Sequence, residues 1–362
     1  MGRKNIKALT GLAFLLAVFA VSCKDKTDCC TVPPPPASGE RQVYVVCEGS
    51  MGNGNSALSL YLPAKDSTYE DVFRAVNQQS LGDVFQSMTL IGDSYFLCVN
   101  NSDQVVVIGK DDRKVKGRIS IPKPRYVLPL SENKALVSTL FSDRIYTIDP
   151  KAMQVSGSFS IPAQNPEGMM LYSNRVFVCP WDTASQELFV IDPATYHIRQ
   201  TIRLEGRAPQ EATLDREGRL WVLSGNAVKG KRAYLTRLDP DNGQVLKTYV
   251  FPNGADALRL EWNNTKDTLY FIEVNYDGGT QHNGIFRMGI HQQELPAQPF
   301  IAAQAYQYFW ALGVEPGTGN IYVGDPRGFI QKGIVYVYRP DGSKLTQFTT
   351  GVGPGHFYFS GY

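Results

Sequence analysis

Asn174-Arg-Val-Phe-Val-Cys-Pro-Trp-Asp182, followed by Glu187-Leu-Phe-Val-Ile-Asp-Pro193, has the pattern of a strand, a polar turn and a second strand. The pattern occurs seven times in the chain. An aromatic residue or leucine followed by an apolar residue marks the first strand, at Tyr44-Val45, Phe96-Leu97, Leu136-Val137, Phe177-Val178, Trp221-Val222, Tyr270-Phe271 and Tyr322-Val323. The second strand recurs at residues 58–62, 104–108, 144–148, 187–191, 234–238, 284–288 and 333–338. Successive copies lie 40 to 52 residues apart, which is the period of a four-stranded propeller blade. The sequence therefore predicts an all-β fold, a seven-bladed β-propeller.

The residues between the strands support this interpretation. Asp-Pro or Pro-Asp follows the second strand in four copies, where both residues favour a turn, at Asp149-Pro150, Asp192-Pro193, Asp239-Pro240 and Pro340-Asp341. No window has the apolar spacing of a long amphipathic helix, so we expect few helices. A single blade cannot bury both of its faces, and the core must therefore form between neighbouring blades.

The two ends of the repeat region indicate how the ring closes. The first copy begins at the second strand of a blade, residues 42–47, and has no innermost strand before it. The last residues form an unpaired apolar strand, His356-Phe-Tyr-Phe359. We expect this C-terminal strand to pair with the N-terminal blade and to serve as its innermost strand.

The residues before the propeller are predicted to be a targeting segment. Residues 1–22 combine the basic Arg3, Lys4 and Lys7 with a short apolar stretch, which is typical of a signal peptide. Ala20-Val-Ser-Cys23 resembles the lipobox of bacterial lipoproteins, and this predicts cleavage before Cys23 and lipidation of its thiol. Residues 23–40 would form a proline-rich tether and residues 41–362 the propeller. The alternatives are a plain secretory signal and, for a lipoprotein, retention on the periplasmic side.

Composition and motifs do not indicate an enzyme. The formal net charge is +2, which favours neither nucleic acid nor an acidic membrane surface as a partner. The chain has only four histidines and no catalytic, phosphate-binding or metal-binding signature. Cys47, Cys98 and Cys179 are expected to be small buried hydrophobic residues between blades rather than disulfides or metal ligands. We therefore predict a binding protein with no covalent cofactor and no metal site.

Ligands of propellers commonly bind where loops converge on one face of the ring. The loops entering the innermost strands and those joining the second and third strands share that face. In this chain they mix aromatic residues with amides and arginines, which suits a large ligand that carries many amide groups, or a sugar. The candidate ligand-binding residues are Phe85, Arg125, Tyr126, Phe141, Trp181, Arg207, Asn226, Tyr276, Tyr308, Arg327 and His356.

The lipobox, the proline tether and the opening Val43-Tyr-Val-Val-Cys-Glu-Gly-Ser-Met-Gly-Asn-Gly-Asn55 resemble the YncE-like propeller lipoproteins of Bacteroidetes. Many of these begin with Asn-Glu-Gly, whereas this chain has Cys47 before Glu48-Gly49. The resemblance covers residues 41–362 and includes the BtuG-type cobalamin-binding proteins. It implies a protein that is lipid-anchored in the outer membrane and faces the cell exterior. Such a protein would capture cobalamin (vitamin B12) or a related corrinoid and deliver it to a TonB-dependent transporter of the BtuB type.

The sequence is also compatible with other functions. The same layout would suit a surface glycan-binding protein whose aromatic side chains stack on sugar rings, or a scaffold that contacts only other proteins. A lyase of this fold would need histidines that face the axis, and only His356 is placed for that role.

Overall fold

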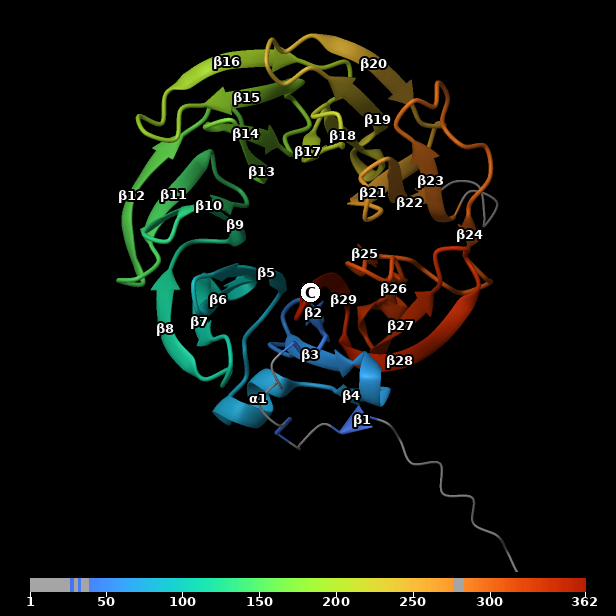
Figure 1. The fold of residues 1–362 in the computed structure, drawn as a ribbon. Helices are drawn as coiled ribbons and strands as arrows, with labels where there is room; N and C mark the ends of the chain where they lie inside the picture. Colours follow the sequence, from blue (N-terminus) through green and yellow to red (C-terminus); the bar gives the residue numbers. More distant parts are fainter. Residues whose placement is uncertain (1–26, 29–31, 34–38, 276–282) are drawn as a thin grey trace, which may run out of the picture.

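The computed structural model describes residues 27–28, 32–33, 39–275 and 283–362. Within them the chain forms seven β-sheets arranged as blades around a central axis (Figure 1). The predicted seven-bladed propeller is confirmed. The predicted signal peptide and Cys23 lie outside the described residues.

Each blade has four antiparallel strands. From the axis outward, blade 1 contains β29 (Pro354–Ser360), β2 (Gln42–Cys47), β3 (Ala57–Leu62) and β4 (Ser67–Tyr69). Blade 2 contains β5 (Phe85–Ile91), β6 (Ser94–Val99), β7 (Gln104–Gly109) and β8 (Val115–Ser120). Blade 3 contains β9 (Pro124–Ser131), β10 (Lys134–Thr139), β11 (Arg144–Asp149) and β12 (Gln154–Ser160). Blade 4 contains β13 (Pro166–Tyr172), β14 (Arg175–Pro180), β15 (Glu187–Ile191) and β16 (Ile198–Arg203).

The remaining three blades have the same order of strands. Blade 5 contains β17 (Pro209–Leu214), β18 (Leu220–Asn226), β19 (Lys231–Leu238) and β20 (Val245–Val250). Blade 6 contains β21 (Ala255–Trp262), β22 (Thr268–Asn275), β23 (Gly284–Gly289) and β24 (Ile301–Ala302). Blade 7 contains β25 (Ala311–Val314), β26 (Ile321–Asp325), β27 (Lys332–Tyr338) and β28 (Lys344–Val352).

The ring closes as the sequence predicts. The C-terminal strand β29 pairs antiparallel with β2, with Val43 opposite Phe359 and Val45 opposite Phe357. Blade 1 therefore combines the two ends of the ring. It also carries a short fifth strand, β1 (Thr27–Asp28), which pairs in parallel with the outer edge of β4.

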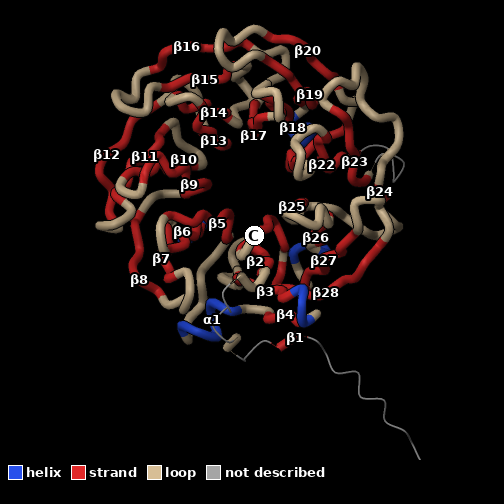
Figure 2. The backbone as a smooth tube through the Cα atoms, in the orientation of Figure 1, coloured by secondary structure: helices blue, strands red, loops and turns tan. Residues whose placement is uncertain are grey.

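Helices are few, as expected (Figure 2). The described residues contain one α-helix, α1 (Val72–Asn77), and four one-turn 3₁₀ helices at Pro63–Lys65, Asn100–Ser102, Ala227–Lys229 and Arg327–Phe329. Asp71 caps α1 by accepting a hydrogen bond from the backbone N–H of Arg74. No helix among the described residues has the length and hydrophobicity needed to span a bilayer.

The hydrophobic core consists of seven clusters, one between each pair of neighbouring blades. Between blades 5 and 6, for example, Trp221 and Phe251 pack with Phe271 and Phe286. Cys47, Cys98 and Cys179 are buried free thiols in these interfaces, as predicted, and burial raises the pKa of Cys98 to about 12. These cysteines therefore contribute packing rather than reactivity.

The loops separate into two faces. Loops between second and third strands bond to the loops that enter the innermost strand of the same blade: the N–H of Leu140 donates to Lys123 O at 2.9 Å, and that of Trp181 to Asn165 O at 2.8 Å. We call this side of the ring the mouth face. The opposite face carries the Asp-Pro turns, in which the aspartate accepts bonds from following backbone N–H groups, as Asp192 does from Ala194 at 2.7 Å.

Candidate functional site

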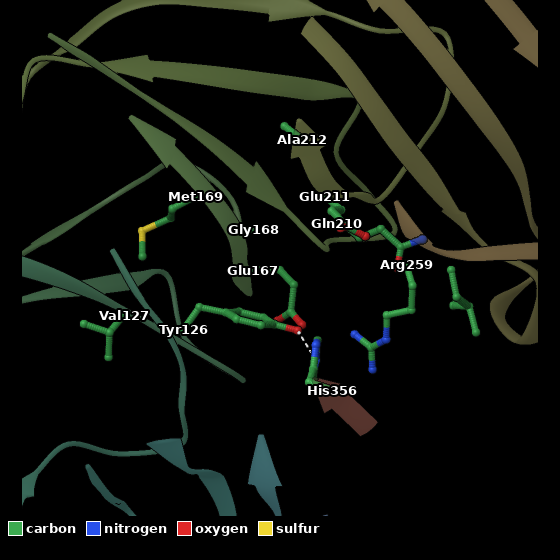
Figure 3. A pocket seen from close by; sticks show the side chains of 11 residues that line it. Tyr126, Val127, Glu167, Gly168, Met169, Gln210, Glu211, Ala212, Arg259 and His356 are labelled. Atoms are coloured by element: carbon green, nitrogen blue, oxygen red, sulfur yellow. Dashed lines mark hydrogen bonds between the residues drawn. The ribbon is translucent and has the colours of Figure 1, made fainter. Parts of the chain in front are cut away.

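A cavity of about 270 Å³ lies on the axis of the ring, among the first residues of the innermost strands at the mouth face (Figure 3). Five of the seven innermost strands line it. The lining residues are Tyr126, Val127, Glu167, Gly168, Met169, Gln210, Glu211, Ala212, Leu258, Arg259 and His356. We call this cavity the axial pocket.

The repeat itself delivers polar groups to the pocket. An innermost strand begins with proline at Pro124, Pro166 and Pro209, and the next residue is Arg125, Glu167 or Gln210. Gly168 allows β13 to approach β17, because a Cβ at this position would lie 2.5 Å from Gln210 O and 3.1 Å from Glu211 Cα. Neighbouring innermost strands thus place their polar side chains around one small space.

A buried ion pair forms one wall. Arg125 Nε donates to both carboxylate oxygens of Glu167, at 2.9 and 3.1 Å, and Arg125 also bonds to Glu167 through Nη2 and to Gln86 through Nη1. Burial alone would favour the neutral guanidine, but the Glu167 carboxylate outweighs it and holds the pKa of Arg125 above its ordinary value. Arg125 and Glu167 therefore neutralise each other and fix the wall.

His356 and Tyr126 meet beside this pair. The Tyr126 hydroxyl lies 3.4 Å from His356 Nε2 and accepts a hydrogen bond from Gln86 Nε2 at 3.1 Å. Burial, together with the charges of Arg259 and Arg125, lowers the pKa of His356 well below its usual value. His356 is therefore neutral at physiological pH and has one nitrogen that accepts a hydrogen bond.

Arg259 enters from the other side through an irregularity in its strand. The pairing of β21 with β22 shifts between Leu258 and Glu261, and Arg259 has a left-handed backbone with a φ of +57°. Such a bulge redirects a side chain, and a non-glycine residue in this region is strained. The guanidinium lies over the Trp310 ring, 5.6 Å from its centroid, and in Figure 3 it points toward His356.

Three further glutamates surround Arg259. Trp310 Nε1 donates to Glu48 Oε1 at 2.8 Å, and Leu260 N donates to Glu211 Oε2 at 3.2 Å. Burial raises the pKa of Glu48 and of Glu211. It also raises the pKa of Glu261, with a further contribution from the Glu211 charge, to about 8. A Cβ at position 355 would lie 2.3 Å from Glu48 Oε1. The glycine therefore leaves room for the Glu48 side chain.

The structure brings three of the sequence-predicted residues, Arg125, Tyr126 and His356, together at the axial pocket. One prediction needs correction: Phe85 is fully buried in the cluster between blades 1 and 2 and offers no surface to a ligand. Phe85 is the first residue of the strand β5, and its apolar side chain packs into the core although the residue adjoins a mouth loop. Tyr276 lies outside the described residues.

The other predicted residues lie on the mouth face, away from the pocket. Phe141 is exposed at a loop tip, and Arg207 and Arg327 are also exposed. Trp181 is half-buried and donates from Nε1 to Gly225 O at 3.3 Å, and Asn226 accepts from Lys229 N at 3.1 Å as a helix cap. Tyr308 stacks on Trp310 with ring centroids 6.1 Å apart.

Several polar residues at the pocket are not among the candidates that the sequence predicts. Those in the lining are Glu167, Gln210, Glu211 and Arg259, and those beside it are Glu48, Gln86, Glu261 and Trp310. A usable signal was present in the polar residue that follows the first residue of five innermost strands, at Gln86, Arg125, Glu167, Gln210 and Asp256. The bulge that turns Arg259 inward has no comparable signature in the sequence.

Exposed apolar side chains stand on the loops of the mouth face. Five large apolar side chains on the mouth loops are at least 73% exposed: Met51, Phe141, Val228, Tyr306 and Ile330. We call them the apolar tips. No other large apolar side chain among the described residues exceeds 52% exposure. A ligand that covers the mouth face would meet these side chains.

The described residues contain no group of three or more histidine, cysteine, aspartate or glutamate side chains arranged to hold a metal ion. The polar groups of the pocket are instead arranged to exchange hydrogen bonds, with Arg259 and Tyr126 as donors and Glu211, Gln210 and His356 as acceptors. The arrangement can therefore bind a polar group by direct hydrogen bonding.

One family of known domains matches nearly the whole propeller. A family profile described as "Domain of unknown function (DUF5074)" matches residues 41–360. No curated protein sequence gives a significant match.

Solved structures share the fold. A quinonprotein alcohol dehydrogenase-like protein from Bacteroides thetaiotaomicron is 16% identical, with a TM-score of 0.66 over 89% of this chain and 79% of that one. The periplasmic gluconolactonase of Pseudomonas aeruginosa is 12% identical, with a TM-score of 0.64 over 88% and 99%. A streptogramin B lyase is 14% identical, with a TM-score of 0.55 over 73% and 82%. At these identities the likeness concerns the fold alone.

Proposed function

We propose that this chain, which belongs to the DUF5074 family of domains of unknown function, is a binding protein that captures cobalamin or a related corrinoid on its mouth face. The observation that carries the proposal is the placement of all five apolar tips on the one face that also opens onto the axial pocket. Since the fold is shared with enzymes, it does not decide between binding and catalysis. We propose binding without a chemical step.

The chemistry of a corrinoid suits this surface. A corrinoid is a broad ring system with apolar faces and a rim of amide side chains. Phe141, Tyr306 and Ile330 provide apolar contacts at the periphery, and the polar groups of the axial pocket provide hydrogen bonds at the centre. The mouth loops are held by backbone hydrogen bonds to one another, so little ordering is needed on binding.

The cellular setting follows from the same proposal. The lipobox at Cys23 would anchor the protein in the outer membrane, facing the cell exterior, and a TonB-dependent transporter of the BtuB type would receive the captured corrinoid. This part rests on the sequence resemblance. Surface glycan binding is the alternative for a face with exposed aromatic side chains.

Calorimetric titration of the purified protein with cyanocobalamin tests the ligand class. We expect one-to-one binding that is nanomolar or tighter. Absence of heat, and a protein that retains no colour after gel filtration, would reject the corrinoid, and a glycan array would then examine the alternative.

Ile330→Ala tests the role of the apolar tips. We expect this variant to bind cyanocobalamin about tenfold more weakly, since roughly 1.4 kcal/mol of apolar contact is lost. The matched control is Ile198→Ala, which removes the same atoms from an exposed position on the outermost strand β16. Equal affinity of the two variants would contradict a ligand on the mouth face.

A further inference from the structure

We infer that the axial pocket is a subsite for one uncharged polar group of the ligand, best matched by a primary carboxamide, with Arg259 as the donor that holds its carbonyl oxygen. The subsite presupposes the proposed capture of a ligand on the mouth face, and it names the part of the ligand that reaches the axis. Its volume of about 270 Å³ lies below the ~300–1,000 Å³ of pockets that enclose a whole drug-sized ligand. The pocket therefore suits a side group of a larger molecule.

Arg259 has hydrogen-bonding capacity that the protein does not use. A guanidinium has five N–H donors in a fixed plane. Nε donates to Trp310 O at 3.3 Å, while Nη2 is 3.9 Å from Glu48 Oε1, which is too far for a hydrogen bond. Within the described part of the chain, the N–H groups of the two terminal nitrogens have no acceptor at hydrogen-bonding distance. They are directed into the pocket (Figure 3), where a ligand oxygen would accept from them.

Acceptors line the rest of the pocket. Glu211 uses Oε2 for the backbone N–H of Leu260, which leaves Oε1 for a ligand donor. Gln210 donates from Nε2 to Ala257 O at 3.2 Å and keeps its own carbonyl oxygen free for a donor. Donors from Arg259 on one side and acceptors from β17 on another match a group that both accepts and donates, as the C=O and NH₂ of a carboxamide do.

The charges of the pocket exclude ions of either sign. A carboxylate would lie near Glu211, Glu167 and Glu48, of which Glu167 already satisfies Arg125. An ammonium group would lie near the Arg259 and Arg125 guanidinium groups. An ion of either sign would meet like charge as well as opposite charge and would lose its hydration on entry, so the neutral group is favoured.

The backbone of Arg259 has an energetically unfavourable conformation, which indicates that the position of its side chain is maintained. A regular β21 would continue the alternation of side chains and carry no left-handed residue at Arg259. The bulge places the guanidinium over Trp310 and toward the axis instead. Strained non-glycine residues of this kind cluster at ligand sites.

Three small probes that each have three carbon atoms and differ in their polar group test the subsite: propionamide, propionate and propylammonium. The readout is the indole ¹H–¹⁵N signal of Trp310, one of four tryptophans, whose ring lies under Arg259. We expect millimolar propionamide to shift this signal, while the two ions at the same concentration do not. Arg259→Met should abolish the shift. Arg216→Met, which removes an arginine paired with Asp267 on the opposite face, should retain it.

Glu211→Gln provides a second variant if Arg259→Met does not fold. It keeps the acceptor for Leu260 N but removes a negative charge, and we expect propionate to shift the Trp310 signal in this variant. The subsite is rejected if an ion shifts the wild-type signal as much as propionamide does, if no probe shifts it, or if Glu211→Gln does not admit propionate.

Titration of the same sample with cyanocobalamin separates the two proposals. Tight binding of cyanocobalamin without a propionamide effect would overturn the subsite and leave the proposed function in place. A propionamide effect that depends on Arg259, without cyanocobalamin binding, would overturn the corrinoid and leave the subsite.

Discussion

Glu261, on the innermost strand β21, has an ionisation that is coupled to folding. Its carboxyl group is buried beside Glu211, and its pKa is raised to about 8 from an ordinary value of 4.5. The folded protein therefore keeps this proton at neutral pH, whereas the unfolded chain releases it. Stabilisation from the protonated Glu261 is complete below pH 4.5 and is lost as the pH rises through about 8.

Glu261→Gln should remove this dependence. We expect the free energy of unfolding of the wild type to fall between pH 5 and pH 8 by on the order of 2 kcal/mol more than that of the variant, since each pKa unit corresponds to about 1.4 kcal/mol and the site is not fully enclosed. Urea unfolding at the two pH values measures the difference. Glu294→Gln, an exposed position on the opposite face, is the control. Identical pH profiles of the wild type and Glu261→Gln would refute a protonated Glu261.

At the residue scale the sequence identifies only part of the site. Arg125, Tyr126 and His356 could be predicted because they stand in loops or strand ends of recognisable type. Arg259 could not, because residues 255–262 are compatible with a regular strand and the inward turn depends on a bulge. Glu48 could not, because nothing in the residues around it marks a side chain that bonds to Trp310 across the interface of blades 7 and 1.

Among the elements, the central strands of each blade were the easiest to predict. β2 and β6 are buried on both faces, so they appear as continuous apolar runs. Outermost strands such as β12 and β16 are mostly exposed and have little apolar signal. The innermost strands line the pocket and mix polar with apolar residues, so their apolar pattern is interrupted.

The strand β29 closes the ring, and its contribution to the stability of the propeller can be measured. Phe357 and Phe359 pack against Tyr322 of blade 7, with ring centroids 5.8 and 5.4 Å apart, while β29 covers the inner edge of β2. Removal of residues 353–362 would expose both surfaces. We expect this truncated chain to lose its cooperative thermal transition in circular dichroism, and removal of only residues 361–362 to lower the Tm by a few degrees at most. A truncated chain that melts like the wild type would rule out closure by β29.

At the scale of the whole molecule, the hydrophobic core lies between blades rather than within them. Each of the seven clusters joins two neighbouring sheets, and the cluster of blades 7 and 1 includes Val43, Val335 and Phe348. Among the described residues no blade has a core of its own, and separation of any pair of blades opens the ring. The stability of the molecule is therefore shared around the axis.

This arrangement predicts a single unfolding transition. Far-UV and near-UV circular dichroism should give coincident urea curves, because loss of one interface removes the support of the next. Val222→Ala, at the interface of blades 4 and 5, should shift both curves equally, by roughly 1–3 kcal/mol. Two separated transitions in the wild type or in the variant would show that some blades fold independently.

Because the two ends of the propeller meet in blade 1, the point in the ring at which the chain begins is not dictated by the fold. Gln42 pairs with Ser360, and Gly361 lies so close to Glu40 that no Cβ would fit between them. A short linker could therefore join residue 362 to residue 39, and new ends could be opened in a turn of the opposite face, such as the one at Asp239-Pro240. The same ring would then be encoded by circular permutants, each with a different blade closed by non-covalent pairing, and the mouth face would be unchanged in all of them.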